Sequence, residues 1–224
     1  KIKKKMISME SDPEYNSPLT LESNKRRVIP NVKLPKHPRA KVIAGLDIDV
    51  SATKSLDFIN FSKFYYKNKL KDLKILIIGP RNESEIFAFA SAGYVIKNIT
   101  AIDLFSYSPL IRLMDMHNLD FEENTFDLVY AGWVIAYSNN RLKAISEMQR
   151  VAKKGGVISL TAGFSNKTNE EIVTERGYMI GSKNRLNNLV DLVNLFDESS
   201  GSIIYKDYLW RENNAAITCY KKTE

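Results

Sequence analysis

Four short segments of this 224-residue chain place a glycine, a carboxylate or an aromatic residue directly after an apolar run. The first segment, 79–85, begins with Gly79 and continues through Arg81 to two glutamates. A glycine lets the backbone approach a ligand closely, and the helix start expected after it offers unpaired N–H groups to an anion. The second segment ends at Asp103, 24 residues after Gly79. A carboxylate at this spacing is suited to accept hydrogen bonds from a ribose diol.

The third and fourth segments add a ring-binding pair and the floor of a pocket. Asp115 and its apolar neighbour Met116 are suited to the edge and the face of an adenine ring. Gly132 and Trp133 follow a further apolar run and are expected at the floor of a substrate pocket. Histidine exchanges protons near neutral pH, which makes His117 the candidate general base for an oxygen or nitrogen acceptor. A structural role is the alternative for this loop histidine.

Aromatic side chains after the apolar run at 126–132 are the candidates for acceptor binding. We expect Trp133 and Tyr137 to line the acceptor pocket, with simple core packing as the alternative. Cys219 lies in an apolar run near the end of the sequence and is expected to be a small core residue.

An alternation of strands and helices has to position these residues. The run at 74–79 is apolar and bounded by turn residues, which is typical of a buried parallel strand. Similar runs predict further strands at 98–103, 110–114, 126–132 and 156–162. Helical periodicity predicts helices over 53–70, 83–92, 139–152 and 184–196. Open α/β sheets bind ligands outside the carboxyl ends of their strands, so the four segments are expected to meet at one edge.

The last two predicted strands form a hairpin. They lie near 202–208 and 215–221, and the connection at 210–214 is too short for a parallel crossover. The predicted fold class is therefore α/β: a Rossmann-like, doubly wound and mostly parallel sheet with a C-terminal antiparallel hairpin.

The N-terminal 41 residues differ from the rest of the chain. They contain five of the seven prolines, and each proline disfavours helix at the residue before it. They also hold 11 Lys/Arg and 4 Asp/Glu, so they account for the whole net charge of +7. We therefore expect a basic extension at 1–41, a linker and covering helix at 42–71, and one domain at 72–224. A phosphate-binding domain carries its own basic face, so a nucleic-acid partner is not expected.

Composition limits the remaining classes. One cysteine excludes an internal disulfide and any multi-cysteine zinc site, and no metal is expected. No run approaches the ~18 apolar residues of a membrane span, and no apolar stretch follows the basic first residues as in a signal peptide. The expected location is cytoplasmic.

From about residue 74 to 220, the chain resembles the class I S-adenosylmethionine-dependent methyltransferases. The resemblance rests on the order and spacing of Ile-Leu-Ile-Ile-Gly at 75–79, Ala-Ile-Asp-Leu at 101–104, Asp-Met-His-Asn-Leu-Asp-Phe at 115–121, Asn-Thr-Phe-Asp-Leu-Val at 124–129 and Glu-Met-Gln-Arg-Val-Ala-Lys-Lys-Gly-Gly-Val-Ile at 147–158. It implies S-adenosylmethionine as the cofactor. It also implies a ribose contact from Asp103 and adenine contacts from Asp115 and Met116. Gly79, Leu104 and Gly132 are further candidates for cofactor contacts.

The chain departs from the family pattern in its first loop. The family reads acid-x-Gly-x-Gly-x-Gly, whereas these positions are Ile77, Gly79, Arg81 and Glu83 here. A guanidinium suits bidentate carboxylate recognition, so Arg81 is a candidate for the methionine carboxylate of the cofactor. Pairing with a nearby protein acid is the alternative. The six residues between Asp103 and Leu110 are too few for a crossover helix, so a loop is expected there.

The predicted function is methyl transfer to a small-molecule acceptor, at oxygen or nitrogen, such as a sugar or another metabolite. No Asn/Asp-Pro-Pro-aromatic segment follows the fourth strand, so methylation of nucleic-acid bases through that motif is not expected. The rival is a binding or scaffold protein of the same fold without transfer activity. A third reading is a nucleotide-sugar or dinucleotide enzyme on a similar sheet.

Overall fold

A computed structural model describes residues 55–67, 69–80, 83–104, 106, 108–176, 182, 184–209 and 215–223. The expected basic extension, the residues up to 54 and Arg81 lie outside the described residues. The strands are β1 (Ile75–Ile78), β2 (Ile99–Asp103), β3 (Ile111–Leu113), β4 (Phe126–Gly132), β5 (Ala152–Gly163), β6 (Gly201–Tyr208) and β7 (Ala215–Lys222). The α-helices are α3 (Leu56–Tyr65), α4 (Ser84–Ser91), α5 (Arg141–Val151), α6 (Asn169–Arg176) and α7 (Leu189–Val193). Short 3-10 turns are η2 (Ile96–Asn98), η3 (Ile135–Tyr137) and η4 (Glu198–Ser200).

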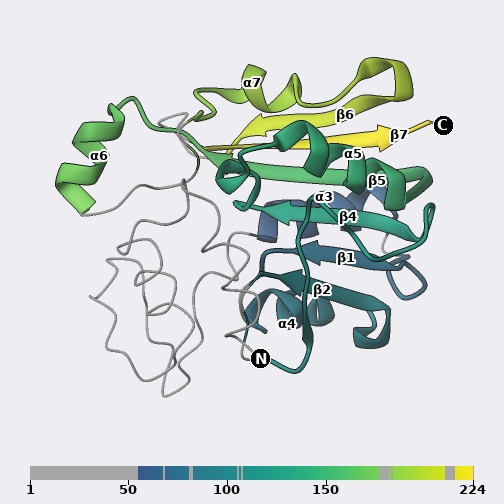
Figure 1. The fold of residues 1–224 in the computed structure, drawn as a ribbon. Helices are drawn as coiled ribbons and strands as arrows, with labels where there is room; N and C mark the ends of the chain where they lie inside the picture. The colour runs from purple at the N-terminus through teal and green to yellow at the C-terminus, as the bar shows by residue number, and fades with distance from the viewer. Residues whose placement is uncertain are drawn as a thin grey trace.

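The strands form one seven-stranded sheet in the order β3-β2-β1-β4-β5-β7-β6 (Figure 1). Strands β1 to β5 pair in parallel, and β7 runs antiparallel to both of its neighbours. The chain builds outward from β1 to β3 and then returns to β4, so strand order reverses between β1 and β4. This arrangement confirms the predicted fold class, including the hairpin.

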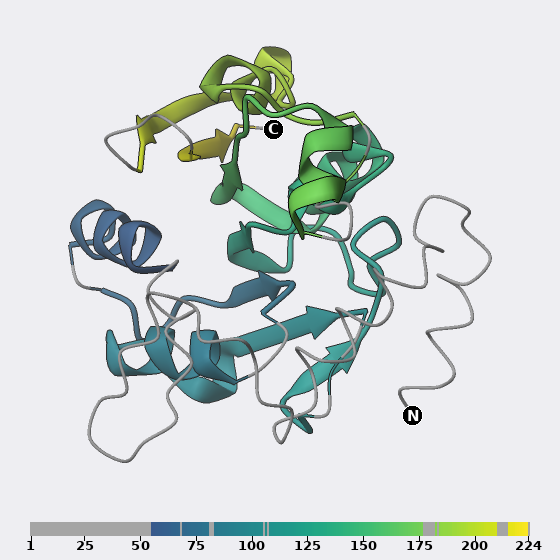
Figure 2. The ribbon, with the colours of Figure 1, turned by 90° about the vertical axis from the view of Figure 1, so that its left-hand side faces the viewer.

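Helices cover both faces of the sheet (Figures 1 and 2). All four residues of β1 are buried because the strand is covered on both sides. Ile75 and Ile77 face the core under α3 and α4, where Phe58 and Phe89 pack. The alternate residues of β1 face the second core, which contains buried residues of α5 and α7.

The predicted helix over 184–196 is much shorter in the structure. Asn188 has an extended backbone, with φ −161° and ψ 178°, and its side chain accepts a hydrogen bond from the Asp191 N–H at 3.0 Å. This N-cap delays the helix start to residue 189, because a capping residue lies outside the helix. Leu186 and Phe196 are buried on either side of α7. The apolar spacing of these two residues therefore reflects their burial, although both lie outside the helix. Helix α6 was not predicted.

The connection from β2 to β3 is a loop, as expected from its length. Its described residues make turns through serine hydroxyls. Ser106 Oγ accepts from the Ser108 N–H, and Ser108 Oγ accepts from the Leu110 N–H, both at 3.1 Å. Ser106 and Ser108 are both buried.

Candidate functional site

The strand register brings the predicted site residues to one row along the carboxyl edge. Ile78 pairs with Ile102 on one side and with Ala131 on the other, so the residues that follow these three are level. These residues are Gly79, Asp103 and Gly132. The row therefore crosses the point where the strand order reverses, the place where open α/β sheets bind ligands.

Gly79 occupies a position that only glycine fits. Its φ is +78°, and its N–H donates to the Ile102 carbonyl at 2.8 Å. A Cβ atom at this position would lie 2.7 Å from Cγ2 of Val134, closer than real contacts allow. The absence of a side chain at Gly79 therefore makes room for Val134, in the segment after β4. Val134 lies beside the switch point, the place between β1 and β4 where the strand order reverses.

The two acidic candidates stand at the ends of neighbouring strands. The Met114 N–H donates to the Asp103 carbonyl at 3.0 Å, which fixes the start of the segment leading to Asp115. Asp103 and the following Leu104 are half-buried, and the Asp115 side chain is 47% exposed. The structure thus brings Asp103, Leu104 and Asp115 together at the ends of β2 and β3. Met116 is buried and packs in the core on the α5 face.

His117 is held on both sides of its ring. Oδ1 of Asp115 accepts from the His117 backbone N–H at 2.9 Å and lies 2.6 Å from Nδ1. Nε2 lies 2.7 Å from Oγ of Ser138, a fully buried residue directly after η3. The histidine therefore connects the segment after β3 with the segment after β4.

The end of β4 carries an uncommon backbone conformation. Trp133 has φ +63°, which is rare for a bulky residue, and such strain persists where neighbours enforce it. Its N–H donates to both the carbonyl and Oγ1 of Thr161, at 2.9 and 3.0 Å. Gly132 is buried, and a Cβ atom there would lie 2.6 Å from Cζ of Tyr130. Trp133 and Tyr137 are half-buried along the segment after β4.

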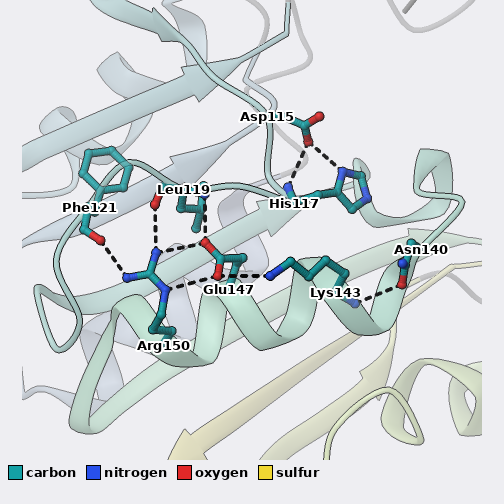
Figure 3. Close-up of polar contacts among 8 residues, drawn as sticks. All are labelled: Asp115, His117, Leu119, Phe121, Asn140, Lys143, Glu147 and Arg150. Atoms are coloured by element: carbon teal, nitrogen blue, oxygen red, sulfur yellow. Dashed lines mark hydrogen bonds and ion pairs between the residues drawn. The ribbon is translucent and has the colours of Figure 1, made fainter. Parts of the chain in front are cut away.

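The segment 115–121 is fastened to α5 by an ion pair (Figure 3). Oε2 of Glu147 accepts from the Leu119 N–H at 2.9 Å and from Nη2 of Arg150 at 2.9 Å. Arg150 in turn donates to the carbonyls of Leu119 and Phe121, at 2.8 and 2.7 Å. The hydrogen bonds from Arg150 and from the Leu119 N–H hold the pKa of Glu147 at about 2, below its usual 4.5. This pair is structural: it fixes a loop that leads away from Asp115.

Three residues of this region were not anticipated from the sequence: Val134, Ser138 and Thr161. Each acts through a contact with a residue on another strand or loop, and such contacts leave no periodic signal. One local feature pointed to Ser138. It lies two residues before Asn140, the N-cap of α5, whose side chain accepts a hydrogen bond from the Lys143 N–H at 3.2 Å.

Among the described residues, no group of His, Cys, Asp and Glu could hold a metal ion. In the same part of the chain, no helix is long and apolar enough to cross a membrane. Cys219 is buried, and burial raises the pKa of its thiol to about 12, so it is a core residue.

Comparisons with known proteins agree with this geometry. The family model described as "Methyltransferase domain" matches residues 78–160, which run from the end of β1 into β5. A curated relative, the phosphatidylethanolamine N-methyltransferase of Cereibacter sphaeroides, is 36% identical over 55 residues. That match covers 25% of this chain, and the chain spans about a quarter (27%) of the length of the relative.

Solved structures share the fold. The PH0226 protein from Pyrococcus horikoshii OT3 aligns with a TM-score of 0.59 and 13% identity, covering 84% of this chain and 97% of that protein. A SAM-dependent methyltransferase from Methanosarcina mazei aligns with a TM-score of 0.55 and 18% identity, covering 71% of this chain and 97% of that protein. At these identities the likeness is one of fold.

Proposed function

We propose that this chain, which carries a class I S-adenosylmethionine-dependent methyltransferase domain, binds that cofactor at the carboxyl edge and transfers its methyl group to a small-molecule acceptor. The observation that carries the proposal is the pair of partly exposed carboxylates, Asp103 and Asp115, at the ends of β2 and β3. They stand beside the switch point of a sheet whose strand order and matched segment agree with the family.

The residues of the row fit the parts of the cofactor. A carboxylate accepts hydrogen bonds in pairs, so Asp103 suits a ribose diol, and Asp115 suits the exocyclic amine of adenine. Leu104, half-buried beside Asp103, would offer an apolar contact to the adenosine. Gly79 and Gly132 would face the methionine end. Arg81 remains the candidate partner for the methionine carboxylate.

The bound cofactor would supply an activated methyl group on a sulfonium. The task left to the protein is to hold the acceptor in line with that group and to exclude competing water. Trp133 and Tyr137 follow β4 at the end of the row and are the proposed acceptor contacts. Thr161 would keep Trp133 in place through its two hydrogen bonds to the Trp133 N–H.

The proposed acceptor is a metabolite with a hydroxyl or an amine. Nitrogen is supported by the name of the curated relative, an N-methyltransferase. Oxygen fits as well, because an aligned, activated methyl group needs little further chemistry from the protein.

Calorimetric titration with S-adenosylhomocysteine tests the pocket without knowledge of the acceptor. Asp103→Asn is expected to weaken binding by about 1.5–3 kcal/mol, the range for hydrogen bonds to a charged group. Asp120→Asn is the control, because that side chain is 91% exposed and lies beyond the row. Equal affinity of wild type and Asp103→Asn would remove Asp103 from the site. No binding by wild type at millimolar ligand would favour a binding or scaffold protein of this fold.

A further inference from the structure

The hydrogen bonds around His117 indicate which ring nitrogen carries a hydrogen. Oδ1 of Asp115 belongs to a carboxylate, which only accepts, and it lies 2.6 Å from Nδ1. Nδ1 therefore carries a hydrogen and donates it. The same oxygen also accepts from the His117 backbone N–H at 2.9 Å. One residue thus contributes two donors to one oxygen, and this fixes the orientation of the carboxylate.

The other ring nitrogen is used by Ser138. The Asn140 N–H donates to Oγ of Ser138 at 3.1 Å, so the hydroxyl already accepts one hydrogen bond. Its own hydrogen is then available for Nε2 of His117, 2.7 Å away. Ser138 is fully buried, so Nε2 faces the interior of the protein. A general base needs a ring nitrogen directed at the acceptor, and here both ring nitrogens of His117 are engaged within the protein.

We propose that His117 is a positioning residue: it fixes the Asp115 carboxylate for adenine and anchors it to Ser138, at the junction of η3 and α5. This inference rests on the proposed function, in which Asp115 binds the adenine of the cofactor. The second anchor of the same loop, Glu147 with Arg150, holds only the far end, at Leu119 and Phe121 (Figure 3). His117 contacts the Asp115 carboxylate itself, and Figure 3 shows its ring directed at that side chain.

The anchor also links two functions of the site. Ser138 directly follows Tyr137, a proposed acceptor contact, and the Ser138 N–H donates to the Ile135 carbonyl at 3.1 Å. Through His117, the carboxylate proposed for adenine is therefore fixed relative to the segment proposed for the acceptor. The catalytic role of proton acceptor would require His117 to give up Ser138 first.

The test is a double-mutant cycle read by calorimetry with S-adenosylhomocysteine and with adenosine. His117→Ala is expected to weaken binding about tenfold, or about 1.4 kcal/mol, for both ligands, because both carry adenine. Ser138→Ala is expected to weaken both to a smaller extent. The double variant should match His117→Ala alone, since residues in one network are not additive. His117→Asn keeps a donor near Asp115 and should recover part of the loss.

Several outcomes would overturn the inference. A histidine with a merely structural role would lower the melting temperature but leave the dissociation constants of the folded variants unchanged. Additive losses in the double variant would show that His117 and Ser138 act separately. A loss for S-adenosylhomocysteine without one for adenosine would place His117 at the methionine end. Absence of binding by wild type would overturn the proposed function and this inference with it, whereas tight wild-type binding with an unchanged His117→Ala variant would overturn this inference alone.

Discussion

Replacing Gly79 with alanine is expected to lower the free energy of unfolding by about 2–5 kcal/mol. Two costs add at this position. An alanine at φ +78° pays about 1–2 kcal/mol for the left-handed backbone. Its Cβ would also lie 2.7 Å from Cγ2 of Val134, and overpacking of this kind costs about 1–3 kcal/mol. Urea denaturation of both proteins measures the sum.

Gly155 provides a matched control for the backbone cost. Its φ is +74°, nearly that of Gly79, but a Cβ atom there would meet nothing within 4 Å. Gly155→Ala should therefore show the backbone cost alone. The double variant Gly79→Ala with Val134→Ala should recover part of the steric cost. If Gly79→Ala and Gly155→Ala were equally destabilised, Val134 would not be the reason for the glycine.

Glu147→Gln is expected to lower the free energy of unfolding by about 2 kcal/mol near neutral pH, the value for hydrogen bonds to a charged group. Glutamine keeps the size of the side chain but loses the charge that Arg150 and the Leu119 N–H stabilise. The side chain is only 10% exposed, so water replaces these partners poorly. Chemical denaturation measures the change, and Glu122→Gln, at an exposed position, should leave stability nearly unchanged.

The same difference should depend on pH in one direction. The folded pKa of Glu147 is about 2 and its ordinary value is 4.5, so the charged form is favoured by folding. A depressed carboxylate pKa stabilises the fold fully above the ordinary value, and this stabilisation is lost as pH falls through the folded value. The gap between wild type and Glu147→Gln should stay constant above about pH 5 and narrow as pH falls toward 2. A gap that widened on acidification would contradict the ion pair as its source.

The sheet could be predicted because its signals are local. Four consecutive buried residues in β1 and a short connection between β6 and β7 are visible as apolar runs and spacings. The parallel register then places Gly79, Asp103 and Gly132 in one row without further information. Because parallel strands end on the same side of a sheet, the sequence alone could indicate that these residues share one edge.

The contacts between loops that position the site residues could not be predicted from the sequence. Nothing near His117 indicates that its partner is Ser138, 21 residues away on another loop. The sequence around Gly79 likewise does not indicate that Val134 fills the space that a side chain at this position would need. The helix expected over 184–196 begins only at residue 189, because Asn188 is its N-cap. The capping hydrogen bond of this asparagine side chain outweighs the helical spacing of the apolar residues around it.

The position of β7 inside the sheet has a consequence for synthesis on the ribosome. Strands β1 to β5 can pair once Gly163 has emerged from the ribosome, but β5 then presents an open edge until β7 inserts between it and β6. The 51 residues from 164 to 214 separate the two events, which is roughly 3–10 seconds of translation at typical rates. During that interval the nascent chain carries an unprotected parallel strand, the kind of edge that pairs with other chains. We therefore expect a nascent chain halted before residue 215 to aggregate or to bind chaperones.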